Sequence, residues 1–328
     1  MAWWQRAGLI LVIGVQGFVG VAGAAAQTYP SRPVTIAVPY TAGGGIDVVT
    51  RLVAQRLSER LGQPFVIDNR TGAGGLLATQ HVARAAPDGY TLLLGSDAQL
   101  AAQVTLRKSP GYDPVKDFAP VALIGNTPFG LVVSAALPAQ SVADLVRLAK
   151  AQPGKISYGS SGVGGIPHLL AEMFMSMTGT TLTHVPYKGT AEALRDVVAG
   201  HVPMTFTGLV PVVGLLKEGK IRVLGVTSTR RIAVVPDAPP ITEAGVPGFE
   251  AVAWLMLVAP AGTPQPVVAR LHREIAAITE LPELQAQFAK VGYFAPDPTP
   301  QDRLRPLIAW EIARWGKVIE GGGFARTQ

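Results

Sequence analysis

Three glycine-rich turns are the segments of this sequence whose residue types and spacing best suit ligand chemistry. They are Gly43-Gly44-Gly45, Gly72-Ala73-Gly74-Gly75 and Gly162-Val163-Gly164-Gly165, each between an apolar strand-like segment and a helix-like segment. Glycine lets the backbone approach a ligand closely, and the start of a helix offers unpaired N–H groups that favour an anion. The sequence therefore predicts a site for a small anionic solute, formed largely by main-chain groups.

Signatures of enzymes do not accompany these turns. Gly159-Ser160-Ser161-Gly162 lacks the G-x-S-x-G spacing of a nucleophile elbow, and no phosphate-binding G-K-[ST] sequence occurs. The five histidines have no close metal-binding spacing, and cysteine is absent. We therefore expect no catalytic activity, no cofactor and no metal.

The first 26 residues predict export. Arg6 precedes an apolar segment from Gly8 to Val21, and Ala24-Ala25-Ala26 has the small side chains of a cleavage site. A retained membrane anchor is the alternative, since the apolar segment approaches the length of a spanning helix. The glycines and the alanine-rich end favour a cleaved signal peptide, with a soluble mature protein in the periplasm.

Composition limits the partners of the mature chain. The full sequence has 328 residues, 48% of them apolar and only 15% charged, with a net charge of +6. Basic residues occur as isolated pairs such as Arg107-Lys108, so nucleic acid is not an expected partner. The length suits two lobes with substantial cores, and we expect a monomer.

Strand-like and helix-like segments alternate, which predicts an α/β fold with parallel sheets covered by helices. The alternation occurs in two stretches, separated by extended segments near 121–129 and 249–258. We expect a first lobe of residues 27–124 and 250–328 and a second lobe of residues 125–249. Ligands of open α/β sheets bind at the carboxyl ends of strands, and two facing lobes can close over them as on a hinge.

Longer motifs make the sequence resemble a known family. They are Tyr29-Pro30-Ser31-Arg32-Pro33-Val34, Val38-Pro39-Tyr40 with Gly43-Gly44 and Asp47, Asn69-Arg70 with Gly72-Ala73-Gly74-Gly75, 86–93 (APDGYTLL), 112–121 (YDPVKDFAPV), 185–189 (VPYKG), 259–264 (APAGTP) and 311–315 (EIARW). In order and over the whole mature chain, they resemble the Bug-type substrate-binding proteins of the tripartite tricarboxylate transporter family.

This resemblance implies a two-lobed periplasmic-binding-protein fold of type II, often called a Venus flytrap. It also implies a receptor that binds a small carboxylate or amino-acid-like solute between the lobes and passes it to a membrane permease of two further proteins. Carried over by position, the solute site would comprise Tyr40, Thr41, Ala42, Gly43, Gly44, Ser96, Asp97, Ser160, Ser161, Gly162, Gly164, His168, Tyr187, Lys188, Gly189 and Thr207.

Two departures from the family leave the solute open. Asp97 follows a strand where relatives often have small hydroxyl residues, and Thr207 stands where they usually have Asp or Asn. We hypothesise that Asp97 faces the site and pairs with a cationic part of the solute. Asp47, in contrast, is expected to hold N–H groups of its loop. Two other functions remain open, a ligand-sensing partner of a signalling kinase and an exported hydrolase.

Overall fold

The computed structural model describes residues 29–187 and 189–327. The predicted signal peptide, residues 1–26, and the predicted site residue Lys188 lie outside the described residues. Among the described helices, none combines the length and the apolar character that a membrane span needs.

The first lobe contains a mixed sheet in the order β2-β1-β3-β9-β4. Its strands are β1 (Val34–Val38), β2 (Phe65–Asn69), β3 (Thr91–Ser96), β9 (Val252–Pro260) and the first part of β4 (Phe118–Ser134). β1 pairs in parallel with β2 and β3, whereas β9 runs antiparallel to both β3 and β4. Four strands therefore share one direction, and β9 alone runs against them.

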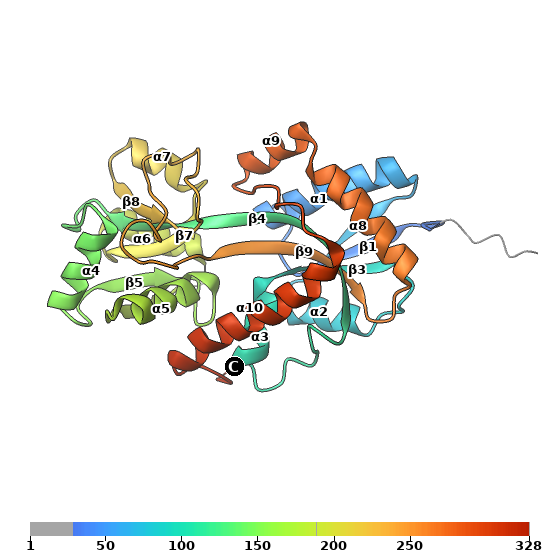
Figure 1. Ribbon diagram of the computed structural model, residues 1–328. Helices are drawn as coiled ribbons and strands as arrows, with labels where there is room; N and C mark the ends of the chain where they lie inside the picture. Colours follow the sequence, from blue (N-terminus) through green and yellow to red (C-terminus); the bar gives the residue numbers. More distant parts are fainter. Residues whose placement is uncertain (1–28, 188, 328) are drawn as a thin grey trace, which may run out of the picture.

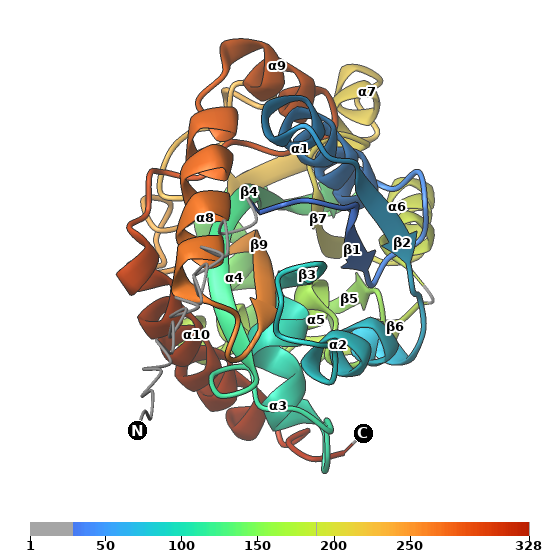
Figure 2. The same cartoon turned by 90° about the vertical axis from the view of Figure 1, so that its right-hand side faces the viewer.

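Helices cover both faces of this sheet, because alternate strand residues are apolar on each side. α1 (Gly45–Leu61), α8 (Gln265–Thr279) and α9 (Pro282–Lys290) pack on one face. The other face of the sheet is covered by α2 (Leu76–Ala83), the one-turn η1 (Ala73–Gly75), η2 (Ala98–Ala102), α3 (Gln103–Leu106) and the start of α10 (Gln301–Gly321). Figure 2 shows the sheet curling between these two groups of helices.

The second lobe repeats the plan with the order β8-β4-β7-β5-β6. Its elements are the end of β4, β5 (Ser157–Ser160), β6 (Thr183–Pro186), β7 (Met204–Gly208), β8 (Ile221–Val226), α4 (Val142–Ala151), α5 (Ile166–Thr178), α6 (Thr190–Ala199) and α7 (Val212–Lys217). β4 is antiparallel to β7 and β8, and β5, β6 and β7 are parallel. The predicted fold class, two lobes with mainly parallel sheets, is confirmed, with one reversed strand in each.

β4 is one continuous strand, although Asn126-Thr127-Pro128 has the composition of a loop. Asn126 stays extended because its N–H and C=O both pair with Phe294, at 2.9 Å each. Pro128, which has no N–H to offer, pairs in register with Val252 of β9. As a result β4 passes from one lobe into the other beside β9 (Figure 1).

The strand directions aim the carboxyl ends of the two sheets at each other. β3 runs parallel to β4 and thus toward the second lobe, while β7 runs antiparallel to β4 and thus toward the first. The residue of β9 that pairs with Ser96 of β3 also pairs with Gly125 of β4. Gly208 of β7 pairs with Phe129, which is further along β4. Along β4 these two strand ends are about 13 Å apart, at about 3.3 Å per residue.

α10 joins the two lobes a second time. Its first turns pack on the first-lobe core through Leu304 and Ile308, and its last turns enter the second-lobe core through Trp315 and Ile319. Figure 1 shows α10 running beneath β9 toward α5. The predicted assignment of 250–328 to the first lobe stays a prediction, because this helix contributes to both cores.

Candidate functional site

Loops at the facing strand ends form the candidate site. We call 39–45, 70–75 and 96–99 the first-lobe loops, and 160–165, 186–187 with 189, and 208–211 the second-lobe loops. In the first group Thr41, Ala42, Gly43 and Gly44 are exposed. In the second group the predicted residues Ser161, Gly162, Gly164, Tyr187 and Gly189 are half-buried. These residues can meet a solute with little rearrangement.

Four helices begin at these loops with a glycine as the N-cap residue and without a side chain that caps them. Their N-cap residues are Gly44 for α1, Gly75 for α2, Gly165 for α5 and Gly189 for α6, none with a side-chain cap hydrogen bond. In contrast, the hydroxyl of Ser141 caps α4 by accepting the N–H of Asp144 at 3.1 Å. The helix starts at the site therefore leave first-turn N–H groups for another acceptor, which favours an anion.

α1 and α5 begin with the same turn. Gly43 has a φ of +82° and donates its N–H to Oδ2 of Asp47 at 2.9 Å. Gly164 has a φ of +75° and donates its N–H to Nδ1 of His168 at 3.0 Å. In both turns a glycine takes the left-handed conformation, and the side chain four residues later accepts its N–H. The prediction that Asp47 holds a loop N–H group is confirmed.

Gln99 connects all three first-lobe loops. Its Oε1 accepts the hydroxyls of Tyr40 and Ser96 at 3.0 and 2.9 Å, and its Nε2 donates to the carbonyl of Gly74 at 3.0 Å. The hydroxyls of Tyr40 and Ser96 also lie 2.8 Å apart. Burial raises the pKa of Tyr40 to about 12, so its phenol stays protonated. The side chain of Tyr40 is thereby held in place among the first-lobe loops.

Asp47 is anchored by a second network. Besides Gly43, its carboxylate accepts Nε of Arg51 and Nδ2 of Asn69, each at 2.8 Å, and Nδ2 of Asn69 also donates to the carbonyl of Tyr40. Burial acts to raise the pKa of Asp47, but the hydrogen bonds from Arg51, Gly43 and Asn69 outweigh it and lower the pKa. Asp47 is therefore ionised and paired rather than free to repel an anionic solute.

Two stacked imidazoles hold the second-lobe loops. His168 and His184 have ring centroids 4.2 Å apart, and Nε2 of His184 lies 2.6 Å from the hydroxyl of Ser160. Burial, and then the neighbouring His168, lowers the pKa of His184 to about 4. Its ring is thus neutral at pH 7, and Nε2 shares a hydrogen bond with the Ser160 hydroxyl. That hydroxyl also accepts the N–H of Gly162 at 3.0 Å and lies 3.2 Å from the carbonyl of Gly162.

Five predicted site residues are buried: Ser96, Asp97, Ser160, His168 and Thr207. Ser96, Ser160 and His168 hydrogen-bond to groups of their own lobe, and Asp97 accepts the N–H of Ala98. Burial and then the nearby carboxylate of Glu311 raise the pKa of Asp97 to about 7, while Arg314 opposes the shift. A contact of these five residues with the solute stays a prediction.

Sequence reasoning missed Gln99 and His184 as site residues. Gln99 is a polar residue in the apolar segment Ala98–Ala102, three residues after Ser96, which is a detectable signal. His184 lies beside Tyr158 only because β5 and β6 pair in that register. No spacing in the sequence brings it to Ser160, because 23 residues separate the two.

Ser160 and His184 are the residue types of a catalytic nucleophile and its base, but their surroundings do not suit catalysis. Ser160 is fully buried, and its hydroxyl already accepts the N–H of Gly162. Among the described residues, no acidic side chain hydrogen-bonds to His184 to orient it, as a catalytic base requires. No group of His, Cys, Asp and Glu side chains in the described chain suits a metal ion either.

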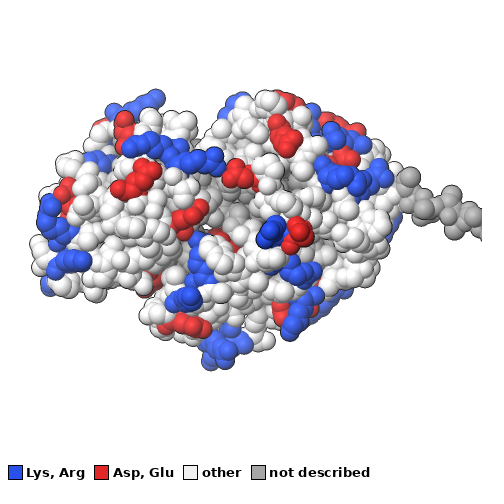
Figure 3. Space-filling view, viewed as in Figure 1, with Lys and Arg blue, Asp and Glu red and all other residues white. Residues whose placement is uncertain are grey.

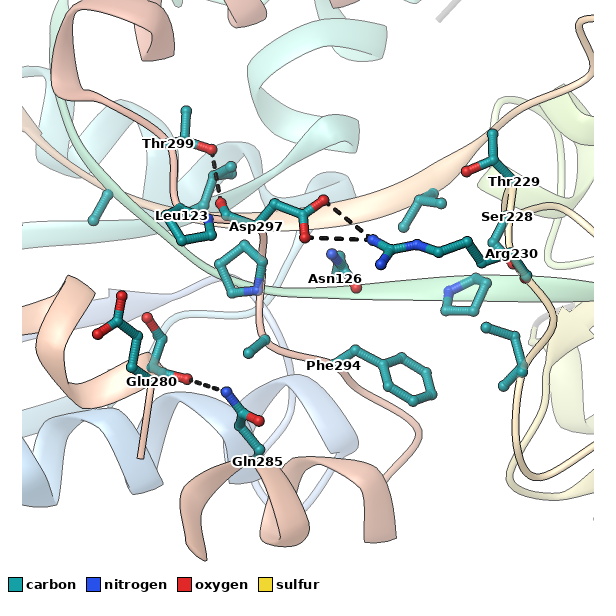
Figure 4. A pocket seen from close by; sticks show the side chains of 18 of the residues that line it. Leu123, Asn126, Ser228, Thr229, Arg230, Glu280, Gln285, Phe294, Asp297 and Thr299 are labelled. Atoms are coloured by element: carbon teal, nitrogen blue, oxygen red, sulfur yellow. Dashed lines mark hydrogen bonds and ion pairs between the residues drawn. The ribbon is translucent and has the colours of Figure 1, made fainter. Parts of the chain in front are cut away.

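A separate pocket lies beside β4, away from these loops. It has a volume of about 770 Å³ and is lined by β4, α8, the segment 228–233 and the segment 294–299 (Figure 4). Arg230 pairs with Asp297 across it at 3.2 Å. None of the predicted site residues lines this pocket, so it does not replace the strand-end loops as the candidate site.

On one face of the molecule, charge is scattered rather than gathered. On the face that Figure 3 shows, basic and acidic side chains are interspersed and form no continuous basic stripe. This distribution does not suit the backbone of a nucleic acid.

Comparisons with known proteins agree with this geometry. Residues 49–324 match the family described as the tripartite tricarboxylate transporter family receptor. The protein BugT of Bordetella pertussis is 37% identical over 320 residues, which cover 96% of this chain and 97% of that protein.

Solved structures give the same picture. The structure of Rhodopseudomonas palustris Rpa4515 with adipate is 41% identical, with a TM-score of 0.78, and covers 90% of this chain and 99% of its own. MatC (Rpa3494) from Rhodopseudomonas palustris with bound malate is 34% identical, with a TM-score of 0.74, covering 89% and 100%.

Proposed function

This chain belongs to the tripartite tricarboxylate transporter receptor family, and we propose that it binds a small carboxylate between its two lobes. The family consists of periplasmic solute receptors of transporters rather than enzymes. In the proposed function the closed, solute-bound receptor docks on a membrane permease of two further proteins and releases the carboxylate to it.

One observation carries the proposal. The carboxyl ends of both sheets point at each other, and each bears glycine-started helices whose first N–H groups have no side-chain cap. A carboxylate can accept N–H groups from both lobes, which makes closure favourable when it is present and unfavourable when it is absent. Thr41, Gly44 and Ser161 are the proposed contacts, because the N–H groups of Gly43 and Gly162 are already donated to Asp47 and Ser160.

The buried residues serve the same function indirectly. Gln99 keeps the first-lobe loops together, and His168 keeps Gly164 in its left-handed conformation. Holding the N–H groups in place before the solute arrives lowers the entropy cost of binding. The relatives bound to adipate and to malate suggest dicarboxylates as the first compounds to test.

Isothermal titration with adipate, malate, citrate and glutamate tests the proposal, together with the variant Gly44→Val. Gly44 has an extended backbone with φ −73°, and an added Cβ would have its nearest contact at 3.6 Å, so the fold tolerates a side chain there. We expect the valine to cover the start of α1 and weaken binding by about tenfold or more, the equivalent of one lost hydrogen bond.

Gly214→Ala is the matched control. Gly214 lies in α7, outside the loops, with nothing within 4 Å of an added Cβ. The control should bind like the unaltered protein. Equal binding by Gly44→Val and the unaltered protein would contradict the proposed site, and no binding of any small carboxylate would contradict the proposed solute class.

A further inference from the structure

Four buried polar atoms have no hydrogen-bond partner among the described residues, and all four belong to one cluster. They are Oδ2 of Asp97, Nε1 of Trp254, Nε of Arg314 and Nε1 of Trp315. The fifth member is Glu311, whose pKa burial raises, while the neighbouring Arg314, Trp254 and Trp315 oppose that shift. We call these five residues the hinge cluster.

The hinge cluster lies where the lobes join. Asp97 follows β3 in the first lobe, and Trp254 is on β9 opposite Asn126 of the crossing strand β4. The other three members are on α10, which packs on η2 of the first lobe and on α5 of the second (Figure 1). Arg314 also donates to the carbonyl of Glu250 at 2.7 Å, just before β9.

Asp97 is the one acid of the hinge cluster whose negative charge would be unmatched. Nη2 of Arg314 is 2.8 Å from Oε2 of Glu311, so the guanidinium is matched by that carboxylate. Asp97 is 2% exposed and Glu311 is 4% exposed. Because Arg314 is paired with Glu311, the carboxyl of Asp97 is buried without a cation of its own. Among the described residues, the other titratable groups that face Asp97 are Tyr40 and Tyr293. Burial raises the pKa of both phenols, so both are neutral. A second buried negative charge beside Glu311 is costly.

We propose that Asp97 is a positioning residue of the solute site that works in its protonated form, so that solute affinity falls as the solution becomes alkaline. The effect on solute affinity rests on the proposed function of the site, whereas the protonation of Asp97 depends only on the hinge cluster. With the proton in place the hinge cluster is neutral, and η2 stays packed on α10. When the proton leaves to solvent, repulsion from Glu311 pushes η2 away from α10.

The consequence reaches the solute through Ser96 and Gln99. Both are within two residues of Asp97, and both hydrogen-bond to Tyr40 among the first-lobe loops. Displacement of η2 therefore moves the groups that fix Tyr40 and Gly74. This role differs from the sequence hypothesis that Asp97 pairs, as a carboxylate, with a cation on the solute.

The direction of the pH effect follows from the pKa. Burial and then Glu311 raise the pKa of Asp97 from 3.8 to about 7 in the folded protein. The folded state thus holds this proton more tightly than the unfolded state. The stability that Asp97 contributes is fully present below about pH 4 and is lost as the pH rises through about 7.

Asp97→Asn tests the proposal, because the amide has the shape of the protonated acid and cannot ionise. The melting temperature of the solute-free protein and the Kd for adipate are measured between about pH 6 and 8 for the unaltered protein, Asp97→Asn and the surface control Asp297→Asn. We expect the unaltered protein and the control to lose affinity by about threefold or more over this range. Asp97→Asn should keep the pH 6 affinity throughout.

Two outcomes would overturn the proposal. If Asp97→Asn binds poorly already at pH 6, the carboxylate itself is needed, as a solute contact would require. If Asp97→Asn shows the same pH dependence as the unaltered protein, the proton belongs to another group. Should adipate bind neither protein, the carboxylate that binds best in the titrations replaces it, and the melting curves of the solute-free proteins still decide the protonation of Asp97.

A further measurement covers the case in which Asp97→Asn does not fold. Infrared difference spectra of the unaltered protein between pH 6 and 9 should show the C=O stretch of a buried carboxylic acid disappear. In Glu311→Gln, which removes the neighbouring negative charge, that change should occur at lower pH. Absence of the band at pH 6 would contradict the proposal.

Discussion

The first-lobe loops and the second-lobe loops present similar glycine turns but hold them with different chemistry. In the first lobe an amide, Gln99, and a paired carboxylate, Asp47, carry the hydrogen bonds. In the second lobe the stacked rings of His168 and His184 carry them. The backbone geometry at a helix start is thus compatible with several anchors, and the choice of anchor decides how the loop responds to pH.

The difference has a thermodynamic consequence. An amide does not titrate, and the lowered pKa of Asp47 keeps that anchor ionised until the solution is strongly acidic. The imidazole of His184, in contrast, becomes charged once the pH falls to about 4. The second-lobe loops should therefore loosen as the pH approaches 4, and the first-lobe loops should not.

Gln99→Leu should have the largest effect on this comparison. The leucine has a similar volume but leaves the hydroxyls of Tyr40 and Ser96 and the carbonyl of Gly74 without their partner. We expect the free energy of unfolding to fall by about 3 kcal/mol. Gln103→Leu, one turn later, removes a 3.4 Å contact to Gly74 and a half-exposed hydrogen bond from Arg107. It is the matched control and should lose about 1 kcal/mol or less. Urea denaturation measures both, and equal losses would show that Gln99 has no special role.

His168→Leu should come next, with a loss of about 2 kcal/mol, because the N–H of Gly164 loses its acceptor in a buried position. His168→Asn should recover part of this loss, since an amide oxygen can replace Nδ1. Amide hydrogen exchange at Gly164 provides a local readout. Fast exchange in the leucine variant and slow exchange in the asparagine variant are expected, and the same rate in both would refute the anchoring role.

The pH response of His184 is a smaller effect. Its pKa falls from 6.5 to about 4 on folding, so stability declines as the pH drops from 6.5 toward 4. The loss should be about 1 kcal/mol, because the ring is only partly buried and solvent screens its charge. In His184→Phe this part of the pH dependence should vanish, which thermal denaturation at pH 7 and pH 4.5 can detect. An unchanged pH profile would assign the acid sensitivity to another group.

Arg230→Ala should have the smallest effect on the free energy of unfolding and shows how little an exposed ion pair contributes. Arg230 and Asp297 are largely exposed, at 79% and 85% of their side chains, and such pairs contribute about 0.5 kcal/mol or less. A clearly larger loss in urea denaturation would mean that contacts between the lobes outside the loops also control the hinge.

Local signals in the sequence predicted much of the fold and part of the site. Alternating apolar strands and amphipathic helices predicted the α/β class, and the residues Gly43 and Gly164 marked turns that need a positive φ. Asp47 was correctly expected to hold a loop N–H, because it lies within one helical turn of its partner. These features depend on residues close together in the chain, which is why they are visible without a structure.

The tertiary structure decided what depends on distant residues. Asn126 continues a strand because Phe294 pairs with it, and His184 meets Ser160 because β6 pairs with β5. Asp97 is buried beside Glu311 and Arg314 because the last helix returns across both lobes. Sequence by itself determined which turns were built of glycine. Packing between remote segments determined which side chains hold those turns, since hydrogen bonding and desolvation act on groups that only folding brings together.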